Sequence, residues 1–212
     1  MNILIPTVSP ESVEALVFDL GGVLLDVQLQ RTLRAFEALD IRGLGAAEVI
    51  DGNRACFRDL ELGLITQEEF AEAVRRTFPA IPDEQLLEAW NAMLMPFDAQ
   101  RVELLRELGK RCPVYLLSNT NLPHRIRFRE SFRERFGGSF DELFVRCFYS
   151  DELHLRKPDP EIYRSVARQI GTPPGKLLFI DDNAANVSAA RGEGWQACHL
   201  TGGITVTDLF EL

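Results

Sequence analysis

Acidic and hydroxyl side chains follow three short apolar runs of this sequence, at the point where each run ends. Asp19 follows Leu-Val-Phe, Ser118 follows Tyr-Leu-Leu, and the pair Asp181 and Asp182 follows Leu-Phe-Ile. If the runs are parallel strands, their carboxyl ends meet at one edge of a sheet, where α/β proteins bind ligands. These side chains are therefore predicted to share one site.

Each of these residues also has a purely structural interpretation. Asp19 could belong to a turn, and residues 181–183 could cap the next helix. Taken together, however, three carboxylates and a hydroxyl in one crevice would repel one another unless a cation or a charged substrate compensates. Oxygen ligands suit Mg²⁺, which commonly takes one or two protein carboxylates. Asp19 and Asp182 supply that number.

Lys157 is a candidate cation for the same site. It lies in Leu-Arg-Lys-Pro-Asp-Pro, just before a predicted helix, where its ammonium could neutralise a carboxylate nucleophile or a phosphate oxygen. An ordinary surface lysine is the alternative, and position alone favours neither interpretation.

The elements that would position these residues alternate between strand and helix. Five apolar runs have the length of strands: 15–18, 114–117, 143–149, 177–180 and 196–200. Helical patterns separate the later runs, with Asp159 and Gly171 at the expected ends of one helix and Asp98 at the start of another. This alternation predicts an α/β core with a Rossmann-like parallel sheet and helices on both faces.

Residues 28–95 contain helical patterns and no convincing strand. Thr66 and Glu69 form a capping-box pair before an apolar stripe that is typical of helix packing. We therefore expect residues 28–95 to be an inserted α-helical cap, and residues 1–27 and 96–212 to form the core domain.

The composition is that of a globular protein. Hydrophobic residues make up 46% of the 212 residues and charged residues 26%, so the chain can bury a sizeable core. The net charge of −9 disfavours nucleic acid and anionic membranes as partners. No run approaches the roughly 20 apolar residues of a membrane span, and no basic segment typical of a secretory signal begins the sequence. We expect a cytoplasmic protein with a small-molecule partner.

Four ordered motifs resemble those of the haloacid dehalogenase (HAD) superfamily of aspartate-nucleophile hydrolases. They are Val-Phe-Asp19-Leu-Gly-Gly-Val, Leu-Leu-Ser118-Asn119-Thr120, Lys157-Pro158, and Phe-Ile-Asp181-Asp182-Asn183-Ala-Ala-Asn186. The helical insertion is similar to the α-helical cap of that family, so the resemblance covers most of the chain. It adds an expected function to the predicted fold.

The resemblance implies a catalytic role for three residues. Asp19 would attack phosphorus and form an aspartyl-phosphate. Ser118 and Asn119 would bind the transferring phosphoryl group, and Lys157 would hold its charge. Positioning and charge stabilisation of this kind are what phosphoryl transfer chiefly requires.

The resemblance also implies a Mg²⁺ site. Its ligands would be Asp19, Asp182 and the backbone carbonyl of Gly21, with Asp181 and Asn186 in supporting positions. Gly21 is also the main departure from the family, because many of its phosphatases carry there an aspartate that protonates the leaving group. Loss of that group would lower the rate about 10²- to 10⁴-fold unless another acid, a better leaving group or a function other than hydrolysis accounts for the glycine.

The first and second motifs are similar to those of a branch that includes α-D-glucose-1-phosphate phosphatases. The expected function is therefore Mg²⁺-dependent hydrolysis of a small phosphorylated metabolite, such as a sugar 1-phosphate, by a monomer or weak homodimer. One alternative is a metal-independent 2-haloacid dehalogenase, which the pair Asp181 and Asp182 disfavours. The other is a catalytically weak binding or regulatory protein of the same fold.

The cap offers weaker candidates for substrate contacts. Gly63 lies in a segment that resembles the cap turn reaching into the site in related enzymes, and Arg54 and Arg58 are nearby, although a solvated helix face explains both arginines. His154 stands where similar sequences often carry glycine, and we interpret it as a loop variation. A basic cluster could flank the crevice or form helix surface: His124, Arg125, Arg127 and Arg129.

Overall fold

A parallel sheet of five strands forms the centre of the computed structural model, which describes residues 2–6, 8, 10–41, 55–78 and 81–211. The strand order is β4-β3-β2-β5-β6, with every neighbouring pair parallel. The strands are β2 (Ala15–Phe18), β3 (Val114–Ser118), β4 (Arg146–Tyr149), β5 (Leu177–Asp181) and β6 (Gln196–His199). The predicted parallel α/β core is confirmed.

One predicted strand is too long. The run 143–149 contributes only its second half to β4, because Leu143 ends the short 3-10 helix η2 (Phe140–Leu143). Phe140 and Phe144 are buried in the core. These two residues are therefore apolar because they pack in the core, and not because they belong to the strand.

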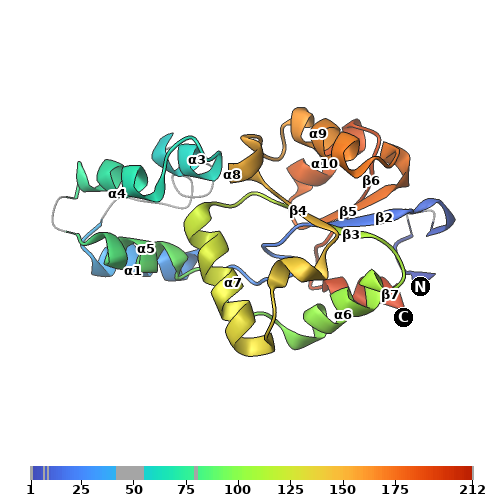
Figure 1. Ribbon diagram of the computed structural model, residues 1–212, viewed down its shortest axis with the longest axis horizontal. Coiled ribbons are helices and arrows are strands. Elements are labelled where there is room, and N and C mark those ends of the chain that lie inside the picture. The colour runs from blue at the N-terminus through green and yellow to red at the C-terminus, as the bar shows by residue number, and fades with distance from the viewer. Residues whose placement is uncertain (1, 7, 9, 42–54, 79–80, 212) are drawn as a thin grey trace.

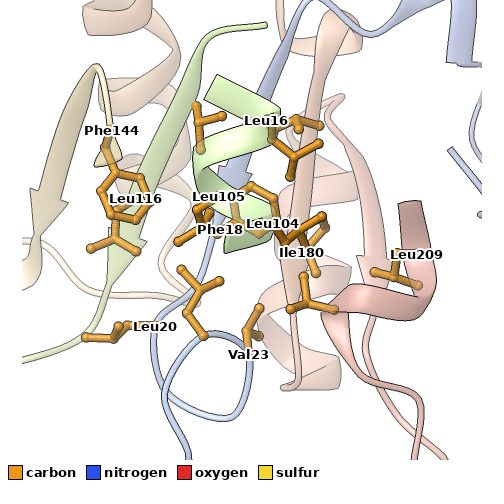
Figure 2. Packing of buried hydrophobic residues seen from close by; sticks show 14 of the residues in the cluster. Leu16, Phe18, Leu20, Val23, Leu104, Leu105, Leu116, Phe144, Ile180 and Leu209 are labelled. Carbon is orange, nitrogen blue, oxygen red and sulfur yellow. The ribbon is translucent and has the colours of Figure 1, made fainter. Parts of the chain in front are cut away.

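Alternate residues of β2 enter two separate apolar clusters on opposite faces of the sheet. Leu16 and Phe18 pack on the side of α6 (Ala99–Gly109) and α7 (Leu122–Phe136), and Figure 2 shows them beside Leu104 and Leu105 of α6. Val17 packs on the other side, where Figure 1 shows α9 (Pro160–Ile170) and α10 (Ala184–Gly192). Burial on both faces explains why the strands read as unbroken apolar runs.

Among the described residues, four helices lie between β2 and α6 in the chain and beside the sheet in space (Figure 1). They are α1 (Leu29–Ala38), α3 (Ala55–Glu61), α4 (Gln67–Arg75) and α5 (Asp83–Asn91). They bury an apolar cluster of their own, with Phe36, Phe57, Phe70 and Trp90 among its members. We call this part of the chain the cap. Its predicted bounds, 28–95, stay a prediction, although a bridge joins Val27 to Leu94 where the chain enters and leaves it.

The predicted helix ends agree with the structure. Asp98 and Asp159 accept hydrogen bonds from the first amides of α6 and α9, Gly171 ends α9 at φ +77°, and Thr66 and Glu69 form the capping box of α4. The remaining elements are β1 (Asn2–Ile3), which pairs antiparallel with β7 (Phe210–Glu211), the helix α8 (Ser150–Leu153), and the 3-10 turns η1 (Pro10–Ser12), η3 (Pro174–Lys176) and η4 (Val206–Leu209). Within the described ranges, no helix is long and apolar enough to span a membrane.

Candidate active site

Three adjacent strands place the predicted residues at one edge of the sheet. Asp19 directly follows β2, Ser118 ends β3, and Asp181 ends β5. The backbone N–H of Asp19 donates to the carbonyl of Ile180 at 2.9 Å, which extends the pairing of β2 with β5 to the nucleophile candidate itself. Asp19, Ser118 and Asp182 line one cavity of about 690 Å³.

Lys157 also lines this cavity, and it is a buried lysine and not a surface one. Its side chain is 1% exposed, and its Nζ lies 2.8 Å from Asp19 Oδ1 and 2.7 Å from Asp181 Oδ2. Burial alone would lower the pKa of Lys157, but Asp19 and Asp181 outweigh burial and raise it. The ammonium therefore stays charged between two carboxyl groups.

Asn119 and Asn186 hold this charged group in place. The side-chain amide of Asn119 donates to the carbonyl of Lys157 and accepts from its backbone N–H, both at 2.9 Å. The amide of Asn186 donates to both oxygens of Asp181, at 3.1 and 3.0 Å. Asn119 therefore uses its side chain to position Lys157, which leaves its backbone amide for the phosphate contact that the sequence predicts.

The carboxyl group of Asp19 carries an unusual pKa. Its pKa is raised to about 7, because burial and, to a smaller extent, Asp181 raise it more than Lys157 lowers it. The N–H of Leu20 also donates to Asp19 Oδ1 at 2.7 Å. A cation next to Asp19 would favour the ionised form that a nucleophile needs.

The chemistry of the donor set fits a hard divalent cation. One oxygen from each of Asp19, Asp181 and Asp182 lies within 4.8 Å of the others. Asp181 is fully buried and already bound by Lys157 and Asn186, whereas Asp182 is exposed to the cavity. Burial and Asp181 raise the pKa of Asp182. Of these three carboxylates, Asp19 and Asp182 are thus the two with oxygens available to bind a cation. Gly21, whose carbonyl is the third predicted ligand, also lines the cavity.

Mg²⁺ is expected to stabilise the protein more at about pH 8 than at about pH 5. The folded-state pKa of Asp19 lies above its unfolded value of 3.8, so this group contributes stability below the unfolded pKa that is lost as the pH rises through about 7. At high pH the metal offsets the buried negative charge, whereas at low pH it must displace a proton. Thermal melts with Mg²⁺ or chelator at both pH values measure the difference. An equal gain in Tm at both would contradict this assignment.

Gly22 is required at its position because a side chain would collide with Asp182. Its φ is +71°, and a Cβ atom there would lie 2.0 Å from Asp182 Oδ2. We expect Gly22→Ala to displace that carboxyl group and weaken the apparent Mg²⁺ affinity by about 10-fold or more, measured by titrating activity with the metal. Gly137→Ala is the matched control, since Gly137 has φ +69° with nothing within 4 Å. Unchanged affinity in Gly22→Ala would refute the prediction.

Residues of the cap and the core line the rest of the cavity, and His124 among them belongs to the basic cluster that the sequence places near the crevice as one alternative. Glu61 and Trp90 line it from the cap, and Arg156 and His124 line it from the core. Arg156 Nε donates to Glu61 Oε1 at 2.6 Å, and the rings of Trp90 and His124 stack at 4.6 Å. Burial lowers the pKa of His124 to about 4, so this histidine is neutral. The only signal for Glu61 was its place beside the cap turn.

Other predicted residues lie away from the cavity. Gly63 has φ +63°, and a Cβ atom there would lie 2.0 Å from the carbonyl oxygen of Asp151. The glycine therefore lets the cap approach the core backbone, and the substrate contact predicted for it stays a prediction. Arg58 is exposed on α3 and does not line the cavity, and Arg54 lies outside the described residues.

His154 and two arginines of the basic cluster also have structural contacts. His154 has φ +54° and donates from Nδ1 to the carbonyl of Leu62 at 2.7 Å, which agrees with a loop role and explains why glycine suits this position. Arg125 pairs with Asp151 at 2.9 Å, and Arg129 with Asp141 at 2.9 Å.

Known proteins match this chain over most of its length. A family model described as haloacid dehalogenase-like hydrolase matches residues 13–194. The chain is 26% identical to D-ribitol-5-phosphate phosphatase of Bacteroides thetaiotaomicron over 87% of its length and 90% of the relative's. It is 32% identical to the sesquiterpene phosphatase astK of Aspergillus oryzae, over 89% and 90%. The crystal structure of HAD family enzyme bt-2542 from Bacteroides thetaiotaomicron, in complex with magnesium and inorganic phosphate, superposes with a TM-score of 0.84 at 29% identity, covering 94% of this chain and 100% of the other.

Proposed function

This chain belongs to the haloacid dehalogenase-like hydrolase family, and we propose that it is a Mg²⁺-dependent phosphatase that hydrolyses a small phosphorylated metabolite through an aspartyl-phosphate on Asp19. One observation carries the proposal. Two carboxyl groups, those of Asp19 and Asp181, contact one buried ammonium, and one oxygen from each of these and from Asp182 lies within 4.8 Å of the others at the wall of a cavity. A single positive charge against three negative ones leaves a deficit that a divalent cation would match.

The residues of the chain divide the reaction between them. The carboxylate of Asp19 attacks phosphorus, and the bond from phosphorus to the ester oxygen breaks. Ser118 and the backbone amides after β3 bind the phosphoryl oxygens, while Lys157 favours the ionised form of Asp19 and neutralises charge on the phosphoryl group. Mg²⁺, when bound by Asp19, Asp182 and the carbonyl of Gly21, supplies further charge neutralisation. Water then attacks phosphorus, releasing phosphate and Asp19.

The substrate is proposed to be a phosphorylated sugar or polyol. The sugar 1-phosphate that the first two motifs favour is one candidate, and D-ribitol 5-phosphate is another, because a relative covering most of the chain is named for it. The cavity suits a hydroxylated group, since Glu61 and Arg156 present an acceptor and a donor on its wall. The cavity also has an apolar side, which includes Trp90, Met93 and Leu94. This side limits how many substrate hydroxyl groups can form hydrogen bonds with the protein.

Release of inorganic phosphate tests the proposal. The panel contains sugar 1-phosphates, sugar and polyol 5- and 6-phosphates, nucleotides and p-nitrophenyl phosphate, each with Mg²⁺ and with a chelator. We expect turnover of at least one sugar or polyol phosphate and its loss in chelator. Metal-independent halide release from 2-haloacids would replace the phosphatase by a dehalogenase, and inactivity on both panels would favour a binding protein.

A further inference from the structure

The glycine at position 21 leaves the site without a proton donor next to the nucleophile. Among the residues that the structure describes, the cavity lining contains one carboxyl group besides Asp19 and Asp182, and this is Glu61. It lies at the end of α3, so the cap and not the core carries it to the cavity.

The backbone of Glu61 is fixed to the core. Ser150 Oγ donates to the carbonyl of Glu61 at 2.8 Å, and His154 donates to the next carbonyl, that of Leu62. The close approach of Gly63 to Asp151 holds the following residue. Three successive residues of the cap turn thus contact the core, which gives the Glu61 side chain a defined position over the cavity.

The carboxyl group of Glu61 is held in place through one of its two oxygens. Arg156 holds Oε1 at 2.6 Å, and within the described ranges no hydrogen bond involves Oε2. The side chain is 22% exposed, on a residue that lines the cavity. A carboxyl group anchored through one oxygen can exchange a proton through the other.

We propose that Glu61 is the general acid and base of the reaction, in place of the side chain that Gly21 lacks. This inference rests on the proposed phosphatase function. In the first step Asp19 bonds to phosphorus, the bond from phosphorus to the ester oxygen breaks, and that oxygen takes the proton of Glu61. In the second step the Glu61 carboxylate takes a proton from water, whose oxygen bonds to phosphorus as the bond to Asp19 breaks. Glu61 is then protonated again.

The charges around Glu61 are compatible with both halves of the cycle. Burial raises its pKa, and Arg156 and Lys157 oppose this effect. A phosphate dianion bound beside Lys157 would offset the ammonium and raise the pKa further, which favours the protonated form when the substrate is present. Arg156 stabilises the carboxylate after the proton has left.

Glu61→Gln tests the proposal through the dependence on the leaving group. With an alkyl phosphate, kcat is expected to fall about 10²- to 10³-fold, because the leaving oxygen needs a proton. With p-nitrophenyl phosphate, whose leaving group needs none, the first step persists and the second slows. Rapid mixing should then show a burst of p-nitrophenolate and an accumulating phosphoenzyme. Glu88→Gln, an exposed residue of the cap helix α5, is the matched control and should behave as wild type.

Distinct outcomes overturn this inference and the proposed function. If wild type turns over both substrates and Glu61→Gln is unaffected, or is slower but shows no burst of p-nitrophenolate, Glu61 is not the acid and base although the phosphatase stands. If wild type releases no phosphate from any substrate, the function itself fails, and this inference with it. If Glu61→Gln does not fold, Glu61→Asp is the second variant. It keeps the charge of the carboxyl group but moves the group away from the reacting atoms by one methylene. The ratio of the first-step rates with alkyl phosphate and p-nitrophenyl phosphate must then fall about 10-fold or more.

Discussion

Asp19→Asn is expected to lower Mg²⁺-dependent phosphate release by about 10⁴-fold or more. The amide has the shape of the carboxylate but neither its charge nor its nucleophilicity, so the covalent step is lost. Lys157 keeps its ion pair with Asp181 at 2.7 Å, so the fold should persist. The measurement is steady-state phosphate release on the best substrate of the panel, with circular dichroism to confirm folding.

The matched control for this variant is Asp98→Asn. Asp98 is exposed and caps α6 through its side chain, a role that asparagine fills as well as aspartate. We expect wild-type turnover from it. Residual activity of more than about 1% in a pure Asp19→Asn preparation would be too high for loss of the nucleophile.

Lys157→Met is expected to reduce turnover about 10³-fold and to destabilise the fold by about 3–5 kcal/mol. Lys157 is the ammonium between Asp19 and Asp181, and its removal leaves two buried carboxyl groups without their shared partner. Lys157 opposes the rise that burial causes in the pKa of Asp19, so that pKa would rise further in the variant, and the loss of stability is smallest at acid pH and grows as the pH rises. Urea unfolding at about pH 5 and about pH 8 measures this trend, and phosphate release measures turnover.

Lys176→Met is the control for the loss of a lysine. Lys176 is half-exposed and pairs with Glu14 on the surface, so its removal should change stability by less than about 1 kcal/mol. Near-normal turnover of Lys157→Met would remove Lys157 from the mechanism. Stability that improved with pH would contradict its placement between two carboxylates.

The arrangement of Asp19, Ser118 and Asp181 could be predicted from sequence because strand ends determine it. Each residue ends a short apolar run, and parallel strands bring such ends to one edge regardless of their distance along the chain. The depth of Lys157 could not be predicted in this way. A residue just before a helix can be exposed or buried. Only the packing of the whole core places the ammonium of Lys157 between two carboxyl groups.

The contacts between cap and core could hardly be predicted from the sequence. Glu61 and Arg156 are 95 positions apart, and Trp90 meets His124 only because α5 docks on α7. Helical periodicity identifies the buried face of α5 on which Trp90 lies, but it does not identify the element that packs against that face. Gly63 shows the same difference, since its residue type predicts a close approach but does not identify the backbone opposite, which is that of Asp151.

Trapping of the covalent intermediate tests the role of Asp19 most directly. Borohydride added during turnover reduces an aspartyl-phosphate to homoserine, which peptide mass spectrometry can locate. We predict homoserine at position 19 only when both substrate and Mg²⁺ are present. Steady phosphate release from protein whose Asp19 stays unmodified, or homoserine at another aspartate, would contradict the account.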